Sequence, residues 1–234
     1  MRIRAQHQPH NRPCRSGAFA RNGICAKQKA RISFSAGPMP AKKSTLRLPP
    51  LTEDQLNPAQ RTLLESMRAG PRGRNVTLAG PFGCYMHAPE IGEVIQQFAA
   101  FCRFKTRLPK RLSEFAILVI GQLWKAQYEF YVHARMAEEA GVLPQTIRDI
   151  KAGRVPAKAP KDERALYDFI KELHQKRRVS DRTYARVHAL VGDGGMVEFL
   201  GLLGSYTLTS MVLNTFRVPL PEGATFPFKE PAGR

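Results

Sequence analysis

The stretch LPKRLSEFAILVIGQLWKAQYEFYVHARMAEEAGV, residues 108–142, decides the fold of this chain. Residues 112–124 are apolar almost all round, and the single ionisable residue among them is Glu114. A helix that is apolar on every side is buried. The segment that begins at Pro109 is therefore predicted to be a central helix.

A second helix is predicted over residues 128–140, where Glu129 and His133 lie one turn apart and Gly141 ends the pattern. Glu114 and His133 are 19 positions apart, which corresponds to about 28 Å along one straight helix. They can share a site only if the chain turns back between two helices. We place that break near residues 124–127, with Gly121 as the nearest weak point.

Two interpretations of these three polar residues remain open from composition and spacing. A buried carboxylate must be paired, protonated or at an edge, and Lys110 or Arg111 could neutralise Glu114 from one turn back. Glu129 and His133 could likewise form a structural hydrogen-bonded pair. Alternatively, the three side chains form a catalytic cluster with perturbed pKa values.

Helical periodicity dominates the rest of the chain from Thr52 onward, and no stretch has convincing strand alternation. TEDQ reads as a capping box that starts a helix ending at Gly70, and residues 71–83 are predicted to be a loop. The fold class is therefore all-α in one domain. Further helices are expected at 89–104 (with Ile91, Val94, Ile95, Phe98 and Cys102 on one buried face), 145–152, 161–176, 181–190 after the cap Ser180, and about 196–216.

The net charge of +18 is concentrated in an N-terminal tail. Residues 1–52 hold 11 of the 37 Lys and Arg and no acid, so the remainder carries 26 bases against 19 acids, or +7. Residues 1–51 are expected to be a disordered tail, residues 52–224 the domain, and residues 225–234 a C-terminal tail. The tail has features of an organellar transit peptide, but we favour an upstream start codon with translation beginning at Met39. It lacks a nucleic-acid reader module, so no specific nucleic acid is expected.

The four cysteines show no CxxC and no zinc-ligand spacing. Free thiols of this kind fit a reducing cytoplasm, and we expect a cytoplasmic protein without a metal site. No apolar run is long enough to predict a membrane-spanning helix.

Residues 108–142 resemble the signature of the carboxymuconolactone decarboxylase family, within the alkylhydroperoxidase D-like superfamily. GPFGCYMHAPEIGEVIQQFAAFCRF, residues 80–104, resembles the family's upstream helix region, and YTLTSMVLNTFRVPLPEG, residues 206–223, its C-terminal helix. The resemblance covers residues 59–223. It implies an all-α alkylhydroperoxidase D-like helical bundle with a central antiparallel helix pair, the required helix break, and a homo-oligomer, trimeric or hexameric.

The superfamily's redox branch carries a Glu, then a CxxC, then a His. Aligned on Glu114 and His133, the two cysteine positions fall on Ala126 and Glu129, so both thiols are missing. A thiol-dependent peroxidase needs an attacking thiolate and a resolving partner. The resemblance therefore favours the decarboxylase-like branch, with His133 as general acid/base, Glu129 as its orienter or second proton carrier, and Glu114 as the buried partner.

The implied reaction is a cofactor-independent decarboxylation of a small carboxylated lactone or a related ring-cleavage product. A thiol-dependent alkylhydroperoxidase and a non-catalytic oligomeric binding protein are the alternatives. Substrate carboxylates need cationic anchors, and the basic residues before the central helix are candidates. The residues predicted to bind substrate are Phe82, Tyr85, His87, Arg103 and Tyr128.

Overall fold

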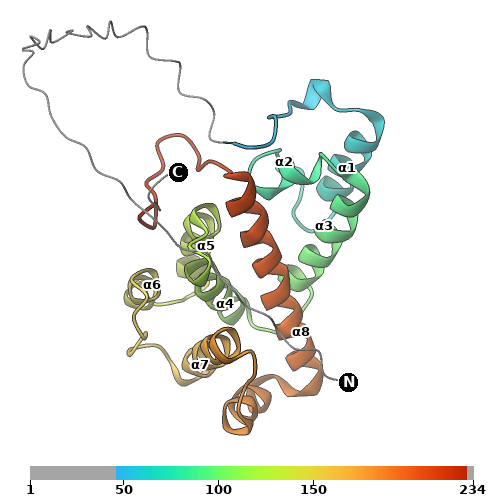
Figure 1. The fold of residues 1–234 in the computed structure, drawn as a ribbon. Helices are drawn as coiled ribbons and strands as arrows, with labels where there is room; N and C mark the ends of the chain where they lie inside the picture. Colours follow the sequence, from blue (N-terminus) through green and yellow to red (C-terminus); the bar gives the residue numbers. More distant parts are fainter. Residues whose placement is uncertain (1–45, 231–234) are drawn as a thin grey trace, which may run out of the picture. The chain divides into compact units, whose positions relative to one another are not determined.

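The computed structural model describes residues 46–230, which belong to one compact unit, Lys43–Arg234. Eight α-helices and one short 3-10 helix make up this part of the chain, and no strand occurs in it. The predicted all-α class is confirmed. The helices, labelled in Figure 1, are α1 Pro58–Ala69, α2 Pro81–Tyr85, α3 Pro89–Phe104, α4 Lys110–Leu123, α5 Gln127–Glu139, α6 Pro144–Lys151, α7 Lys161–Lys176 and α8 Asp181–Phe216.

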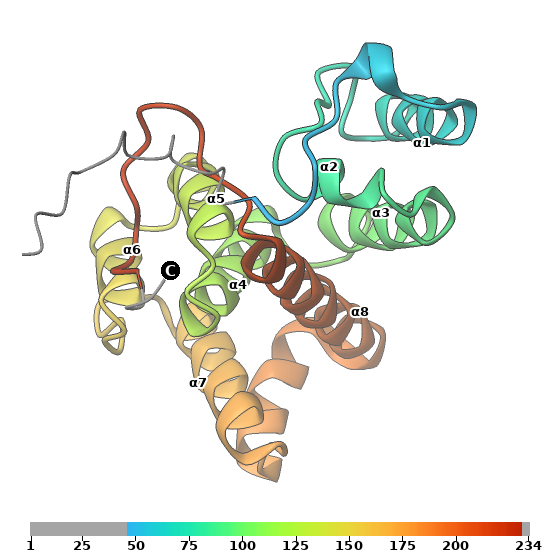
Figure 2. The same cartoon turned by 45° about the horizontal axis from the view of Figure 1, so that its top comes forward.

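The chain breaks between α4 and α5 where the site geometry requires it. Trp124 is still helical, Lys125 has a left-handed φ of 49°, and Ala126 is extended. The amide of Ala126 donates to the carbonyl of Gly121, and that of Lys125 donates to Gln122. These two bonds form a Schellman motif, the common end of an α-helix. The predicted break is confirmed, and α4 and α5 lie side by side as an antiparallel hairpin (Figures 1 and 2).

The central helix α4 is buried along its length. Every residue from Leu112 to Gly121 is buried, including Ser113 and Glu114. It contacts α5, α6, α7 and α8. The prediction of a central helix is confirmed.

Helix α8 separates two hydrophobic clusters. The larger cluster packs α4, α5 and α7 against α8, and the smaller one joins α1, α2 and α3. Figure 1 shows α8 running between these two groups of helices. Val212 of α8 packs against the smaller cluster while Phe199 is buried in the larger one. A site between α2, α3, α5 and α8 therefore draws its side chains from both groups.

One predicted buried face is wrong for most of its residues. On α3, Ile91 is 54% exposed, Val94 62% and Phe98 45%, whereas Cys102 is buried and Ile95 is partly buried. Periodicity indicates an apolar stripe but does not say what covers it. The chain's own core covers the face of α3 that carries Gly92, Gln96 and Ala100 instead.

Two local predictions at the N-terminal side also need correction. The capping box at Thr52 begins only the 3-10 helix Glu53–Gln55, and α1 starts later, at Pro58, with Asn57 as its N-cap. The residue before a proline disfavours helical geometry, so one continuous helix cannot form there. The predicted loop 71–83 contains the start of α2, which Pro81 begins as its first helical residue.

The two predicted C-terminal helices form one element, α8, with an irregular residue at Gly192 (φ 67°, ψ −179°). This kink falls between the two predicted segments. By length and composition α8 is apolar enough to cross a membrane, but half of its apolar 18-residue segment is buried inside the fold. A core helix of a folded domain can be as long and as apolar, since burial against other helices also requires apolar residues.

The ends of the described segment are packed onto the domain. Arg47 pairs its backbone amide with the carbonyl of Phe216, and Leu51 packs against the smaller cluster. Phe228 is buried against Phe130. The Gln127 side chain donates to the backbone carbonyl of Phe228 and accepts from its backbone amide. Arg47, Leu51 and Phe228 thus contact the helices from outside residues 52–224, and the boundaries at 52 and 224 stay a prediction. The rest of both predicted tails, with Met39, lies outside the described residues.

Candidate functional site

Helix α5 presents an unusually polar face to the core. The residues that it buries include Gln127, Glu129 and His133, together with Phe130 and Ala137. Glu129 is 3% exposed and His133 5%. Buried titratable groups are rare unless they are paired, so the partners of these two residues decide what the face does.

His133 is paired with Glu114 across the helical hairpin. Nδ1 of His133 lies 2.6 Å from Oε2 of Glu114, and both side chains are buried. Glu114 precedes the turn at Trp124 by ten positions and His133 follows it by nine, so the antiparallel arrangement brings them level. Arg103 of α3 adds a weaker contact of 3.9 Å to the other oxygen of Glu114.

The pKa of Glu114 is lowered by this environment. Burial by itself raises it, but the hydrogen bond and charge of His133, with the charges of Arg103 and Lys110, outweigh burial. Glu114 is therefore an ionised carboxylate at neutral pH. An ionised carboxylate accepts the Nδ1–H of the imidazole, and Nε2 then faces Glu129.

Glu129 has the opposite character. Its Oε1 lies 3.3 Å from Nε2 of His133, yet this oxygen is buried without a hydrogen bond among the described residues. Burial raises the pKa of Glu129 to about 7, with the Glu114 charge adding to the rise and those of His133 and Arg103 opposing it. Two carboxyl groups on one imidazole thus have well-separated pKa values, which is the pattern of an acid and a base in the same site.

Glu129 and His133 line a cavity of about 230 Å³, which lies between helices of both hydrophobic clusters. Glu129 and His133 form one wall, and Glu114 lies behind His133. The cationic side chains of Arg72 and Arg103 form part of the remaining lining. The other lining residues are Pro81, Phe82, Tyr85, Ala99, Tyr128, Val132, Met136, Tyr206 and Thr209.

The two arginines of the cavity are held by neighbouring groups. Arg72 donates to the carbonyl and side chain of Gln96 and lies over the rings of Phe82 and Phe104. Burial lowers its pKa, although an arginine remains charged at neutral pH. Arg103 lies 4.9 Å over the ring of Phe104. Within residues 46–230 neither guanidinium has a carboxylate at hydrogen-bond distance, so both can receive an anion.

The tyrosines of the cavity are protonated at neutral pH. Burial raises the pKa of Tyr85 to about 12, and burial also raises the pKa values of Tyr128 and Tyr206. The Tyr206 ring packs edge-on against the His133 ring with 5.2 Å between their centroids. This packing fixes the imidazole from the side of α8.

Most of the predicted site residues come together in this cavity. It contains Glu129 and His133 with four of the five predicted substrate-binding residues: Phe82, Tyr85, Arg103 and Tyr128. The fifth, His87, is a correction, because it lines a different cavity and its Nε2 lies 3.0 Å from the Pro49 carbonyl. As a residue that follows α2, it completes the turn before Pro89.

The alternative that Lys110 or Arg111 neutralises Glu114 fits the structure only in part. Arg111 pairs with Asp162 and Glu163 of α7, so it does not neutralise Glu114. Lys110 contributes charge only. The buried carboxylate is instead satisfied by His133, a titratable group that lines a cavity.

Sequence reasoning missed several cavity residues. Arg72 lies in a Gly- and Pro-rich loop where no pattern distinguishes it from a solvated arginine. Tyr206 and Thr209 belong to the segment that resembles the family's C-terminal helix, and their spacing of three residues was a usable signal. Met136 was hidden among the apolar positions of α5.

The described cysteines are not part of this cavity. Cys84 lines the second cavity, and Cys102 is buried in α3. Burial raises the pKa of both thiols to about 11. Cys14 and Cys25 lie outside the described residues. Within residues 46–230 no group of three or more His, Cys, Asp or Glu side chains is arranged to hold a metal ion.

No protein-family model and no curated protein sequence matches this chain. A solved structure, that of an uncharacterized peroxidase-related protein from Silicibacter sp. TM1040, is similar in fold. The TM-score is 0.62 at 14% sequence identity, over 77% of this chain and 94% of that one. At this identity the likeness concerns the fold alone.

Proposed function

We propose that this protein is an acid–base enzyme that moves a proton on a small carboxylated substrate. The observation that carries the proposal is the cluster of Glu114, His133 and Glu129, in which a carboxyl of lowered pKa and one of raised pKa flank a buried imidazole at a cavity wall. Two guanidinium groups, Arg72 and Arg103, lie in the same cavity and suit a carboxylate ligand.

The finer proposal is a decarboxylation like that of carboxymuconolactone decarboxylases. Arg72 and Arg103 bind the substrate's anionic groups and orient its ring against α5. The bond between ring carbon and carboxylate breaks, carbon dioxide leaves, and the electron pair passes into the conjugated system as a dienolate. A proton from Glu129 or from Nε2 of His133 then reaches the carbon, and Glu114 stabilises the imidazolium form of His133. Each turnover consumes one proton, which water returns to the donor residue.

Replacement of the His133 imidazole is the direct test, and it is expected to remove most of the turnover. A substrate set of small unsaturated lactones with one or two carboxylates covers the proposed class. Carbon dioxide release and loss of the conjugated absorbance report the reaction.

A thiol-dependent peroxidase is the second candidate, because the solved structure with a similar fold is titled peroxidase-related. In this chain Ala126 and Glu129 occupy the CxxC positions, and the Cys84 and Cys102 thiols have raised pKa values. A protonated thiol is a poor nucleophile. Where the redox branch has its second thiol, this chain has the carboxyl group of Glu129, which we propose carries a proton.

Alkylation of the accessible cysteines separates the two candidates. We expect full turnover of carboxylated lactones after treatment of the folded protein with iodoacetamide, since neither described thiol lies in the His133 cavity. A peroxide-reducing activity that depends on an added thiol and disappears on alkylation would support the second candidate. Mass spectrometry of the cysteine peptides confirms the extent of modification.

We further propose that the protein assembles into a trimer or hexamer through an apolar surface on α3 and α8. Exposed on α3 are Ile91, Val94, Phe98 and Phe101, spaced three or four residues apart. The Phe98 ring reaches Gly201 of α8, near Val197 (72% exposed) and Leu200 (46%). A continuous apolar patch of this kind typically marks a protein–protein contact.

Val94→Asp is expected to shift the assembly to monomers, because it places a charge in the middle of this surface. Light scattering coupled to size-exclusion chromatography measures the mass. Val155→Asp, at a comparably exposed valine on the loop before α7, is the matched control and leaves the mass unchanged. A wild-type protein that elutes as a monomer at micromolar concentration contradicts the proposal.

A further inference from the structure

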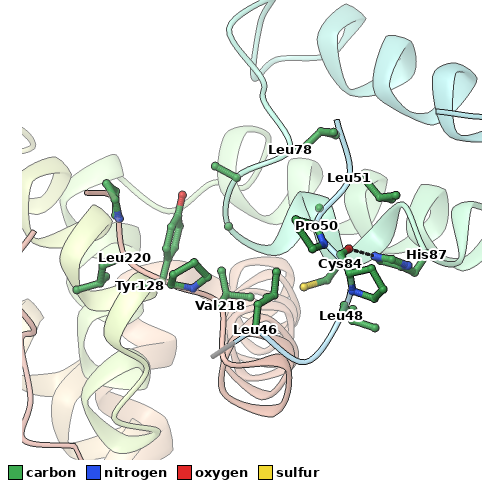
Figure 3. A pocket seen from close by; sticks show the side chains of 16 residues that line it. Leu46, Leu48, Pro50, Leu51, Leu78, Cys84, His87, Tyr128, Val218 and Leu220 are labelled. Atoms are coloured by element: carbon green, nitrogen blue, oxygen red, sulfur yellow. Dashed lines mark hydrogen bonds between the residues drawn. The ribbon is translucent and has the colours of Figure 1, made fainter. Parts of the chain in front are cut away.

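A second cavity of about 260 Å³ adjoins the His133 cavity and is apolar in composition. Its walls come from the segment before the 3-10 helix, from α2 and the loop before it, and from the residues that follow α8 (Figure 3). Leucine, valine and proline side chains dominate, among them Leu48, Leu78, Val218 and Leu220. Of the residues that the structure describes, no Lys, Arg, Asp or Glu lines it. Such a cavity favours a hydrocarbon group over a charged one.

Helix α2 is the partition between the two cavities. Pro81, Phe82 and Tyr85 line the His133 cavity, whereas Gly83 and Cys84 line the apolar one. These two sets lie on opposite sides of a single helical turn. The cavities are therefore separated by the thickness of one short helix.

Tyr128 lines both cavities and is the side chain at their boundary. A Cβ at Gly80 would lie 2.7 Å from Cε1 and 2.9 Å from the hydroxyl oxygen of Tyr128. The phenol thus packs directly on the backbone of Gly80, which has a left-handed φ of 67°. Figure 3 shows the Tyr128 ring beside Val218, across the cavity from Cys84 and His87. Tyr128 is the residue that the two linings share, so a molecule that extends from one cavity into the other contacts its ring.

The polar groups of the apolar cavity are already occupied or protonated. His87 is bonded to the Pro49 carbonyl at 3.0 Å, and burial raises the pKa of Cys84 and of Tyr128. An apolar cavity of ~150 Å³ accommodates a benzene molecule, so this larger one has room for a longer aliphatic or a fused aromatic group. The two cavities together offer an anion-binding subsite and a hydrophobic subsite side by side.

We propose that the apolar cavity binds the hydrophobic end of a substrate whose carboxylate lies at Arg103 in the His133 cavity. This inference rests on the proposed function for the position of the carboxylate. The substrate class is then an amphiphilic acid, in which an alkyl or aryl group extends past Tyr128. A bare carboxylated ring fills the His133 cavity alone.

A series of straight-chain carboxylates from propanoate to decanoate tests the proposal by isothermal titration calorimetry. We expect the affinity to rise about fourfold with each methylene that enters the apolar cavity, which corresponds to ~0.8 kcal/mol of transfer free energy, and then to level off. Val218→Trp fills the cavity and is expected to remove this rise. Val155→Trp, at an exposed valine outside both cavities, is the matched control and keeps it.

Cysteine alkylation locates the bound chain independently of any variant. Decanoate is expected to slow the reaction of Cys84 with a maleimide at least tenfold in the wild-type protein, and propanoate is not. The labelling of Cys84 in the presence of propanoate is the control, since Cys102 is buried and outside the cavity. Equal labelling of Cys84 with and without decanoate overturns the proposal, even if Val218→Trp fails to fold.

The hydrophobic subsite and the acid–base reaction can be tested separately. His133→Gln leaves the apolar cavity intact, so the chain-length rise and the Cys84 protection persist in that variant. If lactone turnover does not depend on His133 but these two effects are present, the hydrophobic subsite stands and the catalytic proposal falls. A flat affinity series combined with His133-dependent turnover supports the catalytic proposal and overturns the hydrophobic subsite.

Discussion

His133→Gln is expected to lower turnover by about 10²–10⁴-fold while the domain stays folded. The glutamine amide can still donate a hydrogen bond toward Glu114, whose Oε2 lies 2.6 Å from the imidazole nitrogen. It cannot take up and release a proton. The variant therefore separates proton transfer from the structural pairing of a buried carboxylate.

Alanine at the same position has a second consequence. It leaves Glu114 buried without its imidazole partner, with Arg103 at 3.9 Å and the charge of Lys110 acting on it. Breaking a buried pair in this way costs about 3–5 kcal/mol of stability. His133→Ala is therefore useful mainly for rescue, since added imidazole can occupy the space of the missing ring and restore part of the turnover.

The measurement is the initial rate of lactone consumption, accompanied by circular dichroism and urea unfolding. His174→Gln is the matched control, because the His174 ring bonds to the Ile170 carbonyl within α7 and lies outside the cavity. The control keeps the wild-type rate. A His133→Gln protein with a rate within threefold of wild type rules out His133 as the proton carrier.

Glu129→Gln is expected to make the protein more stable than wild type above pH 7, by about 3 kcal/mol. The pKa of Glu129 is about 7 in the folded state against 4.5 as the reference value. The folded protein thus holds this proton more tightly than the unfolded chain. The resulting stabilisation is complete below pH 4.5 and is lost as the pH rises through 7. Glutamine stays neutral at every pH, so the variant does not lose stability as the pH rises through 7.

Comparing the two proteins removes contributions from other groups. Glu114 acts in the opposite direction, because its lowered pKa contributes stability above pH 4.5 that is lost in acid. Urea unfolding of wild type and Glu129→Gln at several pH values from about 4.5 to 8.5 gives the difference directly. Glu139→Gln is the control on the same helix, at an exposed residue paired with Arg135. A difference between wild type and Glu129→Gln that stays constant with pH contradicts the prediction.

Much of the fold was predictable because burial leaves a local pattern. The apolar run around α4, the start of α3 at Pro89 and the ends of α7 followed from periodicity and capping residues. The start of α1 was misplaced because a capping box at Thr52 and another at Asn57 compete within six residues. The short helix α2 was missed because Pro and Gly are also loop residues.

The turn between α4 and α5 had no strong local signal. A Schellman motif usually has glycine at the left-handed position, but this one has Lys125. Only the requirement that Glu114 and His133 meet, together with the resemblance of residues 108–142 to a known signature, indicated it. Similarly, Arg72 enters the site from a loop in which nothing marks it.

The sequence by itself determined most of the helical segments, that one of them is buried all round with Glu114 as its polar exception, and that Glu129 and His133 lie on the next helix. Those properties are local, because hydrophobic period and helix caps act over a few residues. The tertiary structure alone decided which carboxyl has a lowered pKa and which a raised one, that His87 faces another cavity, and that the apolar stripe of α3 is left uncovered. These depend on contacts between residues far apart in the chain, where burial and neighbouring charge set the pKa of each group.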